Sequence, residues 1–295
     1  MTPPESGPLG EFLQASRARI SPAEAGVTLY GDRRRVPGLR REELAMLAGV
    51  SSSYYTRLEQ GQSRHASPQV LDALATALRL DDAERAHLHR LAASGGRRRP
   101  ARKPPVERAD PALLELLAAL GDVPALVLGR RSDVLAWNPV GHALLASHLP
   151  AVGSRPNMAT LVFLDPETRD LYADWRAKAG AVVGNLRLVA GAHPDDAALA
   201  LLVGSLTVAS PEFASLWADH RVRPCATAQY ELRHPLVGRL VVTQQTLRSV
   251  EHPDQTLVTH TTPAGSTSAE GLTLLTQLVL GAGDENRTRA ISLGS

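Results

Sequence analysis

The sequence predicts a two-domain protein in which a small all-α domain precedes a larger α+β domain with an antiparallel sheet. Three observations carry this prediction. Residues 41–61, REELAMLAGVSSSYYTRLEQG, have the pattern of two short helices joined by a tight turn. Residues 94–106, SGGRRRPARKPPV, break every periodicity with Gly and Pro and are expected to form a basic linker. From residue 107 onward, alternating apolar runs flank a helical stretch, without a repeating strand–helix–strand order.

Length and charge agree with two domains of different character. The chain has 295 residues, enough for two hydrophobic cores. Residues 1–105 contain 17 Lys and Arg against 11 Asp and Glu, a net charge of +6, whereas the remainder contains 15 against 19, a net charge of −4. A solvated charged surface can produce this imbalance by itself. A basic domain joined to an acidic one is also typical of a nucleic-acid-binding domain attached to a domain with another task.

Five helices are expected in the first domain, residues 9–93. A helix over 9–20 precedes the 41–61 motif, and helices over 67–79 and 81–93 follow it. An isolated helical hairpin would be weak evidence of function. The long order LA-x-x-AGVS-x-x-Y-x-x-x-x-E-x-G, flanked by arginines, favours the helix-turn-helix by which bacterial repressors enter the DNA major groove.

The inner face of the motif is predicted from helical spacing. Leu44, Leu47 and Ala48 lie three and four residues apart, so they are expected to share one buried face of the first helix. Tyr55 and Leu58 are three apart and are expected to bury one face of the second helix. The two helices therefore pack through these faces and leave the opposite faces exposed.

The turn and the helix ends are predicted from residue chemistry. Gly49 suits a helix end with a left-handed backbone, and Gly61 ends the second helix. Ser51 is expected to cap that second helix through its hydroxyl. Glu59 is an acid in a DNA-binding motif, and we expect it to pair within the domain, with Arg17 on the preceding helix.

The exposed positions of the motif are the predicted DNA contacts. Hydroxyls can bond base edges or phosphates, and arginine can fork onto guanine. The residues expected to face bases are Ser52, Ser53, Thr56 and Arg57. Those expected to face phosphates are Arg40 and Arg41, at the start of the first motif helix, and Arg33, Arg34 and Arg35.

The second domain, residues 107–280, is expected to be an antiparallel sheet divided by a helical insert. Its strands are Val- and Thr-rich runs, and its helices begin at capping residues. The expected strands are 124–128, 133–137, 226–233, 238–247 and 255–262; the expected helices are 112–120, one after Asn138, 160–164, 166–190, 195–208, 211–220 and 268–280. Residues 281–295 are polar and are expected to form a disordered tail.

The chain resembles a known family along nearly its whole length. Residues 9–93 resemble Cro/repressor-type (Xre) helix-turn-helix domains. The segment GDRRRVPGLRREELAMLAGVS is similar to the amino-terminal half of MmyB-like regulators, in which an Arg-rich insert separates the first two helices, as Gly31 to Gly38 does here. In the second domain the similar runs are PALVLGRRSDVLAWNPVGHALL, NMATLVFLDPETRDLYADW, SPEFASLWADHRVR, HPLVGRLVV and HPDQTLVTHTTPAGS.

The resemblance implies a PAS-like second domain, a sheet with helices over one face enclosing an apolar cavity. For some members it implies a fatty-acid-like ligand. The chain departs from the family at Gln244 and Gln245, where Tyr-Glu or a similar pair is usual, so the ligand's identity is not carried over.

Three residues are candidates for ligand binding in the second domain: Trp137, Asn138 and Trp175. Buried tryptophans are more often core residues whose indole N–H finds one polar partner, and Asn138, directly before Pro139, is expected to cap a helix. The functional interpretation instead places Trp137 and Asn138 at the mouth of a cavity. Sequence alone leaves both interpretations open.

Nothing in the sequence points to catalysis. The histidines are scattered, and neither a His-Glu-x-x-His run nor paired cysteines mark a metal site. We therefore expect no enzyme activity, no metal and no cofactor. The single cysteine, Cys225, excludes an internal disulfide. Without a leader or a long apolar run, the chain is expected to be soluble and cytoplasmic, with no membrane partner.

Two functions from different classes fit these observations. The first is a transcription regulator whose homodimer reads a near-palindromic operator in double-stranded DNA and whose second domain senses a small apolar ligand. The second is a DNA-binding protein whose second domain is only a protein–protein or dimerisation module. The discriminating feature is a ligand bound in a dry cavity of the second domain, and the resemblance through both domains favours the sensor.

Overall fold

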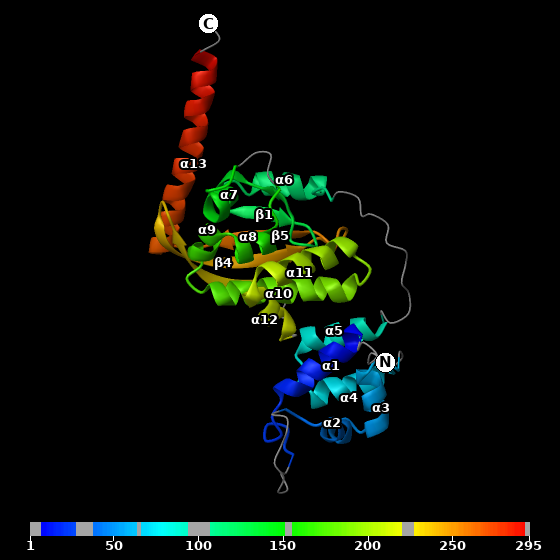
Figure 1. Ribbon diagram of the computed structural model, residues 1–295. Coiled ribbons are helices and arrows are strands. Elements are labelled where there is room, and N and C mark those ends of the chain that lie inside the picture. The colour runs from blue at the N-terminus through cyan, green and yellow to red at the C-terminus, as the bar shows by residue number, and fades with distance from the viewer. Residues whose placement is uncertain are drawn as a thin grey trace. The chain divides into compact units, whose positions relative to one another are not determined.

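The computed structural model describes residues 7–27, 38–63, 66–93, 107–150, 155–219 and 227–292. The expected linker and Arg33, Arg34 and Arg35 lie outside these residues. The chain divides into two compact units, which Figure 1 shows with their helices and strands. One consists of Met1–Lys103, Val183–Thr207 and Ala214–Pro224, and the other of Pro104–Val182, Val208–Phe213 and Cys225–Ser295.

The expected five-helix bundle forms in the first unit. Its core contains Phe12, Leu44, Tyr55 and Leu74, all almost fully buried. One predicted core position was wrong, because Leu47 is 39% exposed. The buried face of its helix is made by Leu44, Ala45 and Ala48 instead. The helices are α1 (Pro8–Arg19), α2 (Arg41–Leu47), α3 (Ser52–Glu59), α4 (Pro68–Ala77) and α5 (Asp82–Ala93).

The second part of the chain has an antiparallel five-stranded sheet in the order β2-β1-β5-β4-β3. The helical insert separates β2 from β3 in sequence, as expected. The strands are β1 (Ala125–Leu128), β2 (Val134–Trp137), β3 (Thr227–His234), β4 (Gly238–Arg248) and β5 (Thr256–Thr261). The helices are α6 (Pro111–Ala119), α7 (Pro139–Ala146), α8 (Met158–Leu164), α9 (Pro166–Leu171), α10 (Trp175–Ala192), α11 (Ala197–Ala209), α12 (Pro211–Ala218) and α13 (Thr267–Ser292).

Two expected elements differ from the structure. The single helix expected over 166–190 is interrupted between α9 and α10, because Tyr172 pairs with Leu232 of β3 and the Ala173 N–H donates to the Glu231 carbonyl at 2.9 Å. Strand pairing thus replaces one turn of helix. The last helix was expected to end at residue 280, whereas α13 runs from Thr267 to Ser292.

The two faces of the sheet are distinguished by strand register. Val127 and Leu257 are paired and pack with Leu117 of α6 on one face. Val242 and Gln244 alternate with more exposed residues of β4 and belong to the opposite face, where the Lys178 side chain of α10 reaches Gln244. Figure 1 shows α6 and α10 on opposite sides of the strands.

Candidate functional site

The turn of the helix-turn-helix is closed by short-range hydrogen bonds. Gly49 has φ of +66°, the left-handed conformation expected of it. The Val50 N–H donates to the Ala45 carbonyl at 2.9 Å, and the Ser51 hydroxyl accepts from the Tyr54 N–H at 3.2 Å. The predicted roles of Gly49 and Ser51 are confirmed, and together they set the direction in which α3 leaves the turn.

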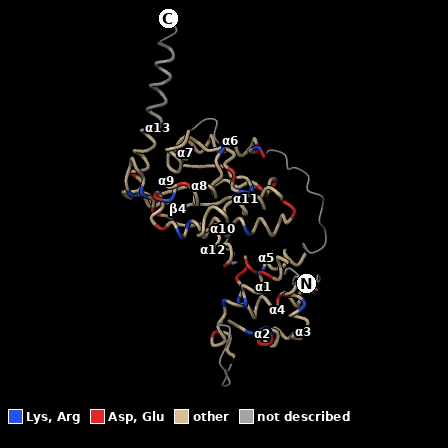
Figure 2. Tube along the Cα trace, viewed as in Figure 1, with Lys and Arg blue, Asp and Glu red and all other residues tan. Residues whose placement is uncertain are grey.

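Helix α3 presents a polar face opposite a fully buried one. Tyr55 and Leu58 have no exposed surface, as predicted. Ser52, Ser53 and Arg57 are exposed and Thr56 is half-buried. Among the described residues, no side chain pairs with the Arg57 guanidinium, so its donors are available to a ligand. Figure 2 shows that basic and acidic residues are both present on the helices of this domain.

Glu59 is buried within the domain and paired, as predicted. Its side chain is 2% exposed and accepts hydrogen bonds from Arg17 Nε and Nη2, both at 3.1 Å, and from Arg41 Nε at 2.9 Å. Burial by itself would raise the pKa of Glu59, but the hydrogen bonds led by that of Arg17 outweigh it and hold the pKa below its usual range. The carboxylate therefore joins α1, α2 and α3 and lies beneath the surface of the domain.

The predicted phosphate contacts lie at the start of α2. Arg40 is the N-cap residue, and its backbone N–H donates to Glu43 Oε2 at 2.6 Å. Its side chain is partly exposed and lies 3.8 Å from Glu42. The Arg41 guanidinium lies 2.8 Å from Glu59, which orients it while leaving it partly exposed. Both arginines thus lie at the N-terminal end of α2, and Arg41 contacts Glu59, the last residue of α3.

The three predicted ligand residues are held by different contacts. Trp175 is buried, and its Nε1 donates to the Val162 carbonyl at 2.6 Å, so it has the polar partner expected of a core tryptophan. Trp137 is half-buried, with its ring 4.6 Å from that of His142. These two side chains contact different neighbours and are not brought together.

Asn138 has a structural role in which both its side-chain oxygen and its side-chain nitrogen form hydrogen bonds. Its Oδ1 accepts from the N–H groups of Gly141 at 2.8 Å and Ala125 at 3.0 Å, the first being the predicted cap of α7. Its Nδ2 donates to the carbonyls of Gly121 and Val123 at 3.2 and 2.7 Å. With both acceptor and both donor positions occupied, Asn138 joins β1 to α7 and has no free group for a ligand.

A buried polar cluster that sequence reasoning missed lies on the α10 side of the sheet. Lys178 of α10 donates from Nζ to Gln244 Oε1 at 2.8 Å, and His260 of β5 is the register partner of Gln244. All three side chains are buried. The available signal was the position of Lys178, which is one helical turn from both Trp175 and Val182 on the apolar stripe of its helix.

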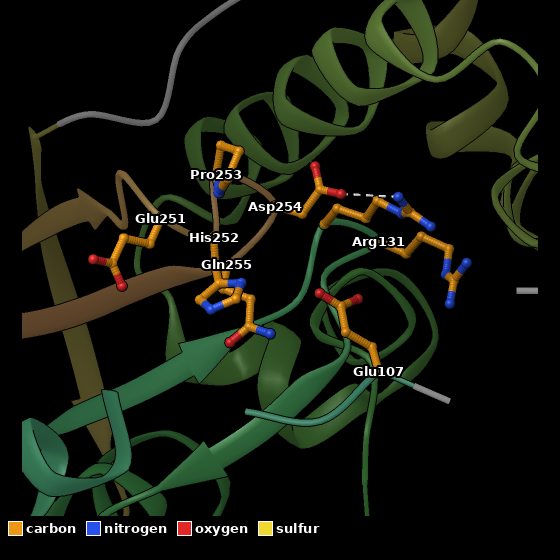
Figure 3. A pocket seen from close by; sticks show the side chains of 8 residues that line it. Glu107, Arg131, Glu251, His252, Pro253, Asp254 and Gln255 are labelled. Atoms are coloured by element: carbon orange, nitrogen blue, oxygen red, sulfur yellow. Dashed lines mark hydrogen bonds and ion pairs between the residues drawn. The ribbon is translucent and has the colours of Figure 1, made fainter. Parts of the chain in front are cut away.

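A charged pocket of about 260 Å³ lies where the second domain begins (Figure 3). Arg130 Nη1 pairs with Asp254 Oδ2 at 2.9 Å, and burial raises the pKa of Glu107. Gln255 accepts from the Asp110 N–H and donates to the Arg108 carbonyl. These contacts fasten the first residues of the domain to the β4–β5 turn, and their charge makes the pocket unsuited to an apolar ligand. It is lined by Glu107, Arg130, Arg131, Glu251, His252, Pro253, Asp254 and Gln255.

The described residues contain no group of three or more His, Cys, Asp or Glu placed to hold a metal ion. Within the same residues, no helix has the length and apolar character needed to cross a membrane.

Comparisons with known families match both domains. A helix-turn-helix domain model matches residues 8–88, and the model of the MmyB-like transcription regulator ligand binding domain matches residues 109–275. The comparison with curated proteins finds no match. The second match covers more than half of the chain, and both descriptions are those of a regulator. The geometry of α2 and α3 therefore belongs to a DNA-binding domain.

Proposed function

The chain belongs to the MmyB-like transcription regulators, and from this membership we propose that it reads an operator as a homodimer and senses a small apolar, fatty-acid-like ligand. Binding DNA and regulating transcription follow from its two domains. The dimer, the operator contacts and the ligand are the proposed parts.

The observation that best supports operator reading is the outward face of α3. Its inner face is closed by Tyr55 and Leu58, while the serine hydroxyls and the guanidinium of Arg57 point away from the core. In a helix-turn-helix, such residues near the start of the second helix meet base edges in the major groove. A symmetric dimer would place two such helices in successive grooves, about 34 Å apart. Arg40 and Arg41 would bind backbone phosphates and so fix the position of the domain along the DNA duplex.

Arg57→Ala is expected to weaken operator binding by about 1–3 kcal/mol and to relax the preference at one base pair, because a bidentate arginine–guanine contact is lost. The measurement is fluorescence anisotropy with an operator selected from random DNA, compared with a scrambled duplex at the same salt concentration. Arg233→Ala removes an exposed arginine of β3 and should change neither affinity. Equal losses on both duplexes would show that Arg57 contacts only phosphate.

Ligand sensing is supported by the family of the second domain and by its mostly apolar buried layers. A ligand regulates only if it binds two states of the protein with different affinity. We propose that occupancy of the second domain changes the dimer geometry and therefore the spacing of the two α3 helices.

Native mass spectrometry of purified full-length protein is expected to show a bound small mass on the dimer that disappears after denaturation. The same spectrum reports the oligomeric state. A dimer without any bound mass would favour the alternative in which the second domain only dimerises or binds protein. The exposed Leu274 and Leu278, four residues apart on α13, are the feature that supports that alternative.

A further inference from the structure

The charged pocket of the second domain contains a carboxylate oxygen without a hydrogen-bond partner. Glu107 Oε2 is buried, and no described residue donates to it. Burial raises the pKa of Glu107, and the positive charges of Arg130 and Arg131 offset only part of this effect. A buried acceptor left unsatisfied is costly, because it has lost its hydrogen bonds to water without gaining others. The pocket therefore offers an acceptor that a bound donor would satisfy.

The two arginines that line the pocket already have acidic partners. Arg130 Nη1 lies 2.9 Å from Asp254 Oδ2, and Arg131 Nε lies 3.6 Å from Asp133 Oδ2. Figure 3 shows that the Glu107 carboxylate and the Asp254 ion pair border the same pocket. The lining side chains include three carboxylates and two guanidinium groups, which leave one net negative charge when histidine is counted as neutral. A ligand with a single positive charge would balance it.

The β1–β2 turn forms a fixed wall of the pocket. Its Ser132 has φ of +68°, a left-handed conformation that is unfavourable for a residue other than glycine. The Ser132 carbonyl accepts from the Met158 N–H at 2.8 Å. Asn157 Nδ2 donates to the Arg131 carbonyl at 2.7 Å. Strained backbone held in place by its surroundings is a common feature of ligand sites, because it positions the binding groups before the ligand arrives.

Gly129, at the start of the same turn, leaves room for the Glu107 carboxyl group. A Cβ atom added to Gly129 would lie 2.6 Å from Glu107 Oε2 and 2.9 Å from Glu107 Cδ. The unsatisfied oxygen is therefore packed against the bare backbone of the turn. Alanine at this position would displace the carboxyl group, and the backbone of Gly129 is not in the left-handed region that alanine avoids.

The size of the pocket and its acceptors limit the class of ligand. Its volume of about 260 Å³ lies just below the range of about 300–1,000 Å³ typical of drug-sized ligands, so a small molecule fits. A bound metal ion needs several ligands at once, and the described residues hold no group of three or more acids, histidines or cysteines placed for one. An ammonium group needs only hydrogen-bond acceptors, and it brings the missing positive charge.

We propose that the charged pocket binds a small organic cation, whose primary ammonium group donates a hydrogen bond to Glu107 Oε2. This site goes beyond the proposed function, because its ligand is polar and cationic, unlike the apolar ligand proposed for the sensor. The ammonium group satisfies the buried oxygen and neutralises the net charge of the lining. The ligand contacts the start of the domain, the β1–β2 turn and the β4–β5 turn together, so binding should also raise the thermal midpoint of the domain.

The test is isothermal titration calorimetry of the full-length protein with 4-aminobutan-1-ol and with butane-1,4-diol, at near-neutral pH and low ionic strength. The two probes have the same carbon chain and differ only in the ammonium group. The unaltered protein should bind the amine at least about tenfold more tightly than the diol, because a charge-assisted hydrogen bond is stronger than a neutral one.

Lower pH should weaken the binding of the amine and leave the diol unchanged. The charged groups that face Glu107 are Arg130, Arg131, Asp133 and Asp254, and burial outweighs the two arginines in raising its pKa. As the pH falls through this raised pKa, the carboxylate takes up a proton and no longer attracts the ammonium group. The probe itself keeps its charge over this range, because an alkylamine loses its proton only in alkaline solution.

Glu107→Gln removes the charge of this side chain and keeps its shape. The affinity for the amine should fall roughly tenfold, to that of the diol, and the thermal midpoint should not drop, because an unpaired buried charge is removed. Glu115→Gln is the matched control, since Glu115 is an exposed acid of α6, and it should bind as the unaltered protein does. Gly129→Ala should also weaken the amine, because its methyl group displaces the Glu107 carboxyl group.

Each outcome bears on the site alone. Retention of the preference for the amine in both Glu107→Gln and Gly129→Ala would overturn it, as would equal binding of the two probes, or binding of neither, by the unaltered protein. An equal loss in Glu115→Gln would show a response to overall charge and would overturn it too. None of these results changes the operator contacts or the apolar ligand, which Arg57→Ala and native mass spectrometry test separately.

Discussion

Glu59→Ala is expected to destabilise the helix-turn-helix domain by about 3–5 kcal/mol, because it leaves the partly buried Arg17 charge without its carboxylate. The Arg17 side chain is only 11% exposed, and its other acceptor is the Leu39 carbonyl. Arg41 loses its anchor in the same change. Glu59→Gln should cost less, because the amide oxygen still accepts one hydrogen bond.

Hydrogen exchange measured by mass spectrometry on peptides from α1 and α3 gives the free energy of unfolding of this domain alone. Glu42→Ala is the control, since Glu42 is exposed and lies 3.8 Å from its arginine; it should cost less than about 1 kcal/mol. Unchanged exchange and unchanged DNA binding in both Glu59 variants would contradict the role assigned to this carboxylate.

The second domain is expected to lose stability as the pH falls from about 7 to 5. Burial and the Lys178 charge lower the pKa of His260 to about 3, and burial also lowers the pKa values of His234 and His142. Below an ordinary histidine pKa of about 6.5, the unfolded chain therefore binds more protons than the folded one. The folding free energy that these histidines contribute by staying uncharged is fully present above about pH 6.5. As the pH falls from there toward the pKa of the folded state, His260 loses up to about 1.4 kcal/mol of this contribution per pH unit.

Urea unfolding followed by tryptophan fluorescence measures this effect, because Trp137 and Trp175 lie in the second unit and Trp217 lies outside the matched helix-turn-helix residues 8–88. His260→Gln cannot take up the proton and should flatten the dependence of stability on pH. An equally steep slope in His260→Gln would show that other groups cause the acid sensitivity.

Local features of the chain were predictable because their causes lie within a few residues. The left-handed backbone at Gly49, the Ser51 cap and the buried pair Tyr55 and Leu58 follow from residue type and helical spacing. The strands of the second domain and the cap by Asn138 follow in the same way. Even the pairing of Glu59 with Arg17 could be expected, since an acid on a DNA-binding helix needs a partner inside the domain.

Other features depended on which segments meet in space. Leu47 continues an apolar stripe but lies outside the contact between helices, so it is exposed. The helical pattern of residues 166–190 is interrupted where Tyr172 and Ala173 bond to β3, some 60 residues farther along the chain. Such competition between helix and strand pairing cannot be read from periodicity.

By itself, the sequence determined the helix-turn-helix, the fold class of the α+β part that follows it and the alternation of strands, because capping, turn chemistry and periodicity act over short distances along the chain. Only the tertiary structure decided that Lys178, Gln244 and His260 share one buried site. The burial of a polar side chain depends on what packs across from it, and here α10, β4 and β5 come together from distant parts of the chain.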